Sequence, residues 1–197
     1  MASFFVNVLG ALIFLFIFWK KIKEDHAGEV IFSAGTFVIL GIILGYFVSA
    51  RFFKEWFFWL EFLGGGLGLG VSIIRFKIRP YEAIDAFVIS LSPWLALTFL
   101  KDSIVNSSLI SFTAFLACLT AIFVYFFLEG RYRSFFWYRS GKVGFSGLST
   151  LGLFFLTRST IAIFFHNVLS FSGKSEIYVS AIVAFVSFLL VFNLSRQ

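Results

Sequence analysis

The chain has 197 residues, of which 60% are hydrophobic and only 13% are charged. Soluble domains are roughly half apolar and a quarter charged, so this composition excludes an ordinary water-soluble fold. One cysteine, Cys118, excludes a disulfide within the chain and a cysteine-based metal site. The net charge of +6 comes mainly from basic residues in short segments between apolar blocks, which indicates contact with anionic lipid headgroups and no nucleic-acid partner.

Seven apolar blocks follow one another along the chain. They are expected near residues 4–19, 30–50, 56–74, 81–100, 109–128, 143–165 and 177–194. The blocks have the length of a membrane span and lack the alternation of barrel strands, which predicts helices. The N-terminus has no charged segment before the first block and no small-residue cleavage site, so we expect this block to be retained as a helix. The sequence therefore predicts one all-α, polytopic transmembrane bundle that covers residues 1–197.

The basic residues between the blocks predict the orientation of the bundle. Alternate connections carry one set, which ends at the C-terminus: Lys20, Lys21, Lys23, Arg75, Lys77, Arg79, Arg131, Arg133, Arg139, Lys142 and Arg196. The other side carries only Arg51, Lys54, Lys101 and Lys174. Because cytoplasmic loops are enriched in Lys and Arg, the larger set is placed in the cytoplasm. The N-terminus is then outside and the C-terminus inside, as expected of a multi-pass protein of a cytoplasmic membrane.

Charged residues inside the blocks are candidate functional residues, because burying a charge in a membrane is costly. Arg158 lies roughly 10 Å and Glu61 roughly 8 Å below the outer surface, from the helical rise per residue. The two could form an ion pair that joins two helices, or Arg158 could bind a lipid phosphate through its planar guanidinium. Asp85 lies near the cytoplasmic boundary, where it is expected to begin a helix beside a basic loop.

Several polar residues are expected at one depth in the outer half of the bundle. They are Tyr46, Glu61, Lys101, Arg158 and His166. Below them lies a glycine run, residues 64–70, which favours either close helix packing or the approach of a lipid chain. The pattern predicts a lipid-headgroup site that opens outward. His26 and His166 fall on opposite sides of the membrane, so no shared metal is expected, and no cofactor is indicated.

Four stretches resemble, in order, segments of the bacterial prolipoprotein diacylglyceryl transferases. They are WKKIKEDHAGEVI after the first block, GIILGYFVS at residues 41–49, LGGGLGLG at residues 63–70 and GLSTLGLFFLTRSTIAIFF at residues 147–165. Within the last stretch, Arg158 matches the family's essential arginine. The family has seven helices with the N-terminus outside, in keeping with the orientation expected here.

The resemblance implies transfer of the diacylglyceryl group of phosphatidylglycerol to the cysteine thiol of a lipoprotein precursor. Arg158, helped by Lys101, would hold the phosphate and stabilise charge on the leaving group. Tyr46 would contact the headgroup, and the glycines Gly64, Gly65 and Gly66 would leave room for acyl chains. The chain keeps the asparagine of the family's signature at Asn106.

The chain also departs from the family pattern. The family's histidine falls on Gly64, an arginine falls on Ile43, and the acidic residue after the late arginine falls on Ala162. His166 is expected at the same surface but does not match the family's histidine. A non-catalytic phospholipid-binding relative is therefore the alternative hypothesis. A small transporter ranks third, because Glu61 and Asp85 are expected at opposite faces with little polar sequence between them.

Overall fold

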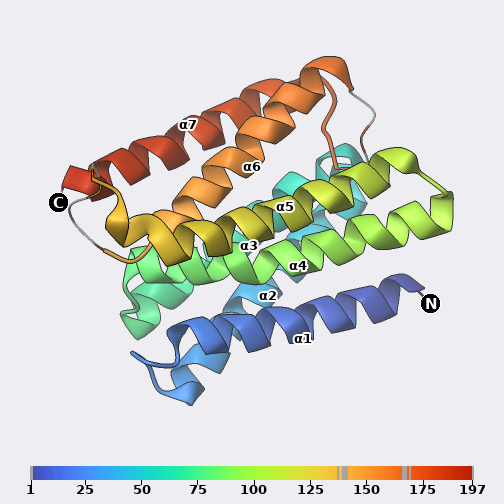
Figure 1. Cartoon of the computed structure of the whole chain (residues 1–197). Helices are drawn as coiled ribbons and strands as arrows, with labels where there is room; N and C mark the ends of the chain where they lie inside the picture. The colour runs from blue at the N-terminus through green and yellow to red at the C-terminus, as the bar shows by residue number, and fades with distance from the viewer. Residues whose placement is uncertain (1, 137, 139–141, 166–167, 169, 197) are drawn as a thin grey trace.

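Seven long helices make up the molecule (Figure 1). The computed structural model describes residues 2–136, 138, 142–165, 168 and 170–196. Its helices are α1 (Ala2–Ile22), α2 (Gly28–Phe52), α3 (Phe57–Phe76), α4 (Pro80–Asn106), α5 (Leu109–Arg131), α6 (Phe145–Phe164) and α7 (Ser175–Arg196), with 3-10 turns at Lys54–Trp56 and Tyr132–Ser134. Within the described residues all regular structure is helical, which confirms the predicted all-α class.

Each of the seven helices is long and apolar enough to cross a membrane. The chain is therefore a multi-pass helical membrane protein, as its composition predicts. Two predicted boundaries differ in a way that matters. Helix α4 continues to Asn106 instead of ending near residue 100, and α7 begins at Ser175, so that Glu176 lies in its first turn.

The α4–α5 corner explains how polar residues extend α4. The carboxylate of Asp102, which is buried, accepts hydrogen bonds from Asn106 Nδ2 at 2.7 Å and from the Ser111 hydroxyl of α5. Ser107 then adopts a left-handed conformation with φ of 48°, and Ser108 caps α5 by accepting a hydrogen bond from the Ser111 amide. Asn106, which the resemblance aligns with the family signature, thus lies at a helix corner.

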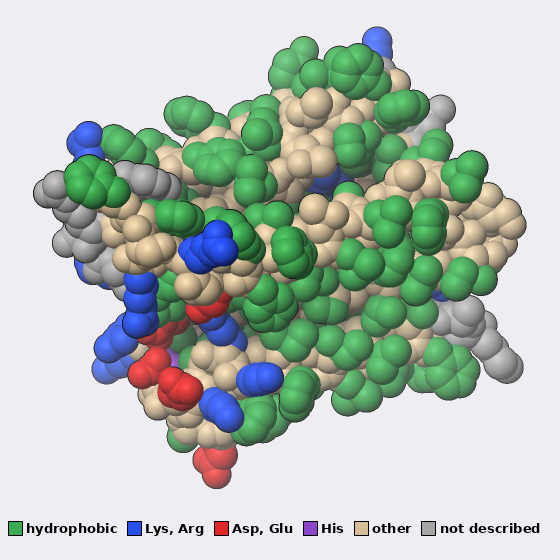
Figure 2. Space-filling view, in the orientation of Figure 1, with side chains coloured by type: hydrophobic (Ala, Val, Ile, Leu, Met, Phe, Trp, Pro, Cys, Tyr) green, Lys and Arg blue, Asp and Glu red, His purple; other side chains and the backbone are tan. Residues whose placement is uncertain are grey.

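Neighbouring helices pack in pairs. Helix α1 lies against α4, α2 against α3, and α6 against α7, while α5 packs on both α4 and α6. The first residues of α1 and the last residues of α7 lie at opposite ends of the bundle (Figure 1). Hydrophobic side chains cover most of the face in Figure 2, and its charged side chains gather mainly at the end where α7 finishes. This distribution suits an apolar belt in contact with lipid.

Helices α2 and α3 approach each other at four glycines. A Cβ on Gly64 would lie 2.2 Å from the Gly41 carbonyl oxygen, and a Cβ on Gly45 would lie 2.2 Å from that of Leu60. Gly68 makes the same kind of approach to Phe37. Such contacts leave no room for a Cβ on these glycines, as in small-residue interfaces between membrane helices. Close helix packing is therefore the role of Gly64 within the glycine run.

Candidate functional site

Arg158 is buried at the end of the bundle where α1 begins, and its partner is Glu176 of α7. The guanidinium donates from Nε to Glu176 Oε1 at 2.9 Å, and its Nη2 lies 2.8 Å from the same oxygen. Nη1 donates to the Ser170 hydroxyl and Nη2 to the Ser170 carbonyl oxygen, both at 2.8 Å. Of the two alternatives considered for Arg158, the ion pair with Glu61 is not formed, because the guanidinium pairs with Glu176 instead.

Aromatic rings enclose the same guanidinium. The carbon Cζ of Arg158 lies 3.8 Å from the centre of the Phe58 ring, 4.9 Å from that of Phe171 and 5.7 Å from that of Phe154. A cation over an aromatic face is attracted by the ring quadrupole, most strongly where water is excluded. The rings therefore stabilise the cation in place of solvent and fix the plane of the guanidinium.

Glu176 is fully buried and accepts hydrogen bonds on both carboxylate oxygens. Trp59 Nε1 donates to Oε2 at 2.9 Å, and the Ser180 hydroxyl donates to Oε1 at 2.5 Å. Because Trp59 belongs to α3, the carboxylate joins α3 to α6 and α7. We refer to Arg158, Ser170, Glu176, Trp59 and Ser180 as the Arg158 cluster.

Beside the Arg158 cluster runs a groove of ≈ 770 Å³ between α5 and α6. Alanines and branched apolar residues make up much of its wall, and Arg158 and Ser170 line it together. The groove follows α5 from Leu109 to Val124, a length of roughly 22 Å. In Figure 2 a small basic area is recessed in the hydrophobic surface between α5 and α6. The groove thus combines a long apolar wall with a buried cation.

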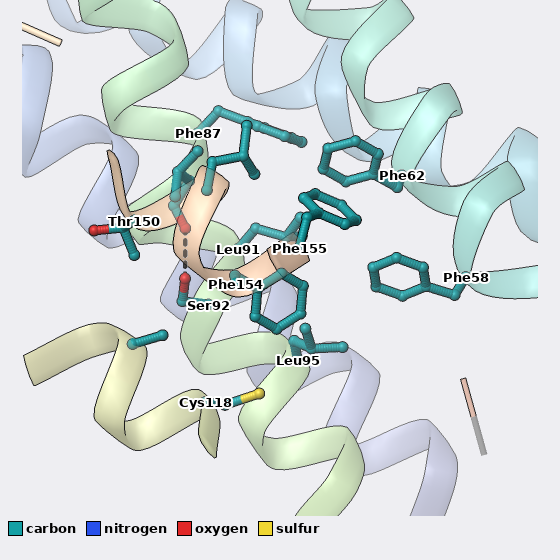
Figure 3. A pocket seen from close by; sticks show the side chains of 13 residues that line it. Phe58, Phe62, Phe87, Leu91, Ser92, Leu95, Cys118, Thr150, Phe154 and Phe155 are labelled. Carbon is teal, nitrogen blue, oxygen red and sulfur yellow. Dashed lines mark hydrogen bonds between the residues drawn. The ribbon is translucent and has the colours of Figure 1, made fainter. Parts of the chain in front are cut away.

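A smaller cavity of ≈ 40 Å³ adjoins this groove inside the bundle (Figure 3). Cys118, Ala121, Thr150 and Phe154 line both spaces. The cavity is walled mostly by aromatic and aliphatic side chains, and the Thr150 hydroxyl has no hydrogen-bond partner among the described residues. The apolar space of the groove therefore continues toward the centre of the bundle.

Three of the other residues predicted for the outer site, Tyr46, Glu61 and Lys101, do not line the groove. Tyr46 is 53% exposed on α2, with its ring against Phe47. Glu61 is half-buried on α3 and has no hydrogen bond or ion pair within the described part of the chain. Lys101 lies on α4, two residues after Phe99, which does line the groove. Of the residues predicted to converge in the outer half, the described lining of the groove thus includes Arg158 but not Tyr46, Glu61 or Lys101.

The remaining predicted residues have other places in the structure. Gly64 packs on α2, a Cβ on Gly65 would meet Ile42 and Phe87, and Gly66 has open space around it. None of these glycines lines the groove, and Asn106 lies at the α4–α5 corner. His166 falls outside the residues that the structure describes.

Glu176 and Trp59 complete the site but were not identified from the sequence. The predicted last span begins at residue 177, which leaves Glu176 just outside it. The available signal was a glutamate among serines directly before an apolar block: Ser170, Ser172, Ser175, Glu176 and Ser180. Hydroxyl groups at this density supply the donors that a buried carboxylate needs, so this run was the one feature that could have marked Glu176.

A second polar cluster lies toward the other end of the bundle. Asp85 of α4 is fully buried and accepts a hydrogen bond from Tyr125 at 2.8 Å and from the Gly147 amide at 2.6 Å. Lys21 Nζ lies 3.0 Å from Asp85 and 2.6 Å from Glu129. Asp85 does not begin a helix, as was expected, but caps the first turn of α6 from the neighbouring α4. We refer to Lys21, Asp85, Tyr125, Glu129 and Gly147 as the Asp85 cluster.

Compared with known protein families, curated proteins and solved structures, this chain matches none. The described residues contain no group of three or more His, Cys, Asp or Glu side chains that could hold a metal ion. Within the same residues the groove is lined by no histidine and no carboxylate, only by Arg158, hydroxyl groups and Cys118 among apolar side chains. This arrangement can bind and orient an apolar molecule with a polar end, but it offers no general base.

Proposed function

We propose that this chain is a membrane protein that binds a lipid, with an acyl chain in the groove between α5 and α6 and the polar end of the lipid toward Arg158. The observation that carries the proposal is the juxtaposition of a long apolar groove with one buried arginine. Burying a cation in a membrane helix is costly and marks a functional residue by default. Here the cation borders the groove at the end of the bundle where α6 finishes.

The wall of the groove suits a hydrocarbon chain. Ala117, Leu153 and Ile161 contribute apolar surface, and the hydroxyls of Thr120 and Thr157 donate to carbonyl oxygens of their own helices. These hydroxyls are thereby satisfied without a ligand. The groove lies on helices that are apolar enough to face hydrocarbon, so a lipid can enter it sideways from the bilayer.

The distribution of basic residues supports an orientation for this site. If the basic connections face the cytoplasm, the N-terminus is outside and Arg158 lies in the outer half of a bacterial cytoplasmic membrane. Single cysteines at Lys23 and Ser107, in a Cys118→Ala background, test this with a membrane-impermeant thiol reagent on intact cells. We expect labelling at Ser107 only, and labelling at Lys23 alone would reverse the orientation.

Blocking the groove tests the binding proposal directly. Ala121 lines both the groove and the inner cavity, so Ala121→Trp would fill the space where they meet. We expect the variant to lose lipid that copurifies with the wild-type chain, as measured by native mass spectrometry. Ala181→Trp, on the exposed face of α7, is the matched control and should retain it. Equal lipid retention in both variants would contradict the proposal.

Diacylglyceryl transfer is the second candidate, favoured because Arg158, which matches the family's essential arginine, borders the groove. Phosphatidylglycerol would be the donor and a lipoprotein precursor the acceptor. Such a transfer needs a base for the thiol, and the described lining of the groove supplies none. The two candidates therefore differ in chemistry, not in the place where the lipid binds.

A complementation experiment separates the candidates. In a strain that lacks its own transferase, an active enzyme would restore lipid modification of a reporter lipoprotein, and Arg158→Ala would abolish it. A chain that only binds lipid would reach the membrane, retain lipid and leave the reporter unmodified. The Ala181→Trp variant again serves as the control for expression and insertion.

A further inference from the structure

We infer that Arg158 offers the bound lipid a single hydrogen bond to an uncharged ester carbonyl oxygen, and not a charged site for its phosphate. The inference rests on the proposed lipid binding and specifies which group of the lipid the groove recognises. It follows from the number of donors that the guanidinium has left, from the balance of charge around it, and from its depth in α6.

The donor count leaves one N–H group. A guanidinium carries five N–H donors, one on Nε and two on each Nη atom. Nε and one N–H of Nη2 face Glu176, the other N–H of Nη2 donates to the Ser170 carbonyl, and one N–H of Nη1 donates to the Ser170 hydroxyl. The second N–H of Nη1 has no partner among the described residues, and Arg158 lines the groove. One donor cannot bind phosphate in the bidentate manner typical of arginine.

The charge of the guanidinium is already balanced. Glu176 is fully buried, and Trp59 and Ser180 hold its carboxylate in place. A phosphate beside Arg158 would add a second anion to one cation, next to a carboxylate that is already fully buried. Turning Glu176 away would break its hydrogen bonds and leave its charge buried without a partner, which is strongly unfavourable. A neutral acceptor can use the remaining N–H without either cost.

The depth of Arg158 points to the same group. Arg158 precedes the end of α6 at Phe164 by a distance of roughly 9 Å along the helix. In a glycerolipid the ester carbonyls lie between the acyl chains and the phosphate. A chain seated in the groove therefore brings its ester oxygen to Arg158 before its phosphate, which stays nearer the membrane surface.

Four lipids separate the ester from the phosphate. Dioleoylglycerol and dioleoylphosphatidylglycerol both carry ester carbonyls, and their dialkyl ether analogues lack them. The effect of the ester is thus measured with and without the phosphate, and the effect of the phosphate with and without the ester. Occupancy of the wild-type chain is measured by native mass spectrometry in an uncharged detergent, with Ala121→Trp as the blocked groove. Because the wild-type chain carries the comparison, its outcome does not depend on a folding defect at Arg158.

We expect each ether analogue to bind about tenfold more weakly than its ester, the size of one hydrogen bond from a charged donor. Removal of the phosphate should change binding by less than about threefold. Equal binding of ester and ether, together with preference for the two phosphate lipids, would overturn this inference while leaving lipid binding intact. Binding that is insensitive to Ala121→Trp, or absent for all four lipids, would instead refute the proposed function.

Discussion

The two polar clusters of this bundle differ in what surrounds them. In the Arg158 cluster the side chain of the arginine is 5% exposed and that of its partner Glu176 is fully buried, yet an apolar groove runs beside them. In the Asp85 cluster Asp85 is equally buried, but Lys21 and Glu129 are 22% and 33% exposed, and neither the groove nor the smaller cavity described above is lined by these residues.

The difference suggests two uses for charge in a membrane protein. The Asp85 cluster draws α1, α4, α5 and α6 together near the membrane boundary, where Lys21 can keep part of its hydration. The Arg158 cluster places a buried ion pair beside a groove, and one N–H of its guanidinium has no partner among the described residues, the donor that we propose for the lipid. Polar groups that only fasten helices satisfy one another, whereas a binding site leaves a group unsatisfied until the ligand arrives.

The largest effect should come from breaking the buried pair. Arg158→Met leaves Glu176 without its counter-ion, and we expect the free energy of unfolding to fall by about 3 to 5 kcal/mol. Denaturant titration in mild detergent measures it. The double variant Arg158→Met/Glu176→Met removes both charges and should recover more than half of the loss. A double variant no more stable than the single one would show that the loss comes from packing, not from an unpaired charge.

A smaller loss is expected in the Asp85 cluster. Asp85→Asn keeps the shape of the side chain but removes the charge that Lys21, Tyr125 and the Gly147 amide share. Lys21 can turn toward water, so we expect a loss of about 1.5 to 3 kcal/mol in the same titration. Glu82→Gln is the control on the same helix, because the partner of Glu82, Arg79, is 74% exposed. Equal losses in both variants would show that Asp85 contributes no more to the free energy of unfolding than Glu82 does.

The ring beneath Arg158 gives a third test of the comparison. Phe58→Leu removes the aromatic face 3.8 Å from the guanidinium, and Phe62→Leu removes a ring stacked on Phe58 that does not contact the arginine. We expect Phe58→Leu to cost about 1 kcal/mol more than Phe62→Leu, the contribution of a buried cation–π contact. If the two variants are equally stable, the ring acts by apolar packing alone.

The smallest effect is expected at the exposed edge of the Asp85 cluster. Glu129→Gln removes an ion pair with Lys21 that solvent reaches, so we expect a loss of no more than about 1 kcal/mol. The loss should shrink further in high salt, because solvent screens exposed charges. A loss as large as that of Asp85→Asn, unchanged by salt, would mean that Glu129 is part of the buried ionic core.

Much of the architecture could be predicted because it depends on local composition. A helix is the way for an apolar block to satisfy its backbone in a lipid environment, so each block predicted a span, and α5 begins at the predicted Leu109. The prediction missed the last residues of α4 and the first residues of α7, because polar residues belong to the helix at both places. There, hydrogen bonds from other segments, such as that from Ser111 to Asp102, satisfy side chains that appear solvated in the sequence.

The candidate site was predictable only in part. Arg158 stood out because a charge inside an apolar block has no local explanation, and that inference needs no knowledge of its neighbours. Depth could not identify its partner. Glu61 lies inside the third predicted span and Glu176 just before the last one, and both are expected near the same face. Only the packing of α6 on α7 decided that Glu176 pairs with Arg158, and only the side-chain contacts of α3 with both helices decided that Trp59 completes the pair.

The sequence by itself determined that this chain forms seven membrane helices and that Arg158 is buried within one of them. Both follow from the free-energy cost of exposing apolar groups to water or of burying polar groups in lipid. This cost is a property of each residue and does not depend on the fold. The tertiary structure alone decided the partner of the arginine, the groove between α5 and α6, and the separation of Tyr46, Glu61 and Lys101 from that groove. These depend on which helix faces are neighbours, a property of long-range packing that no single segment specifies.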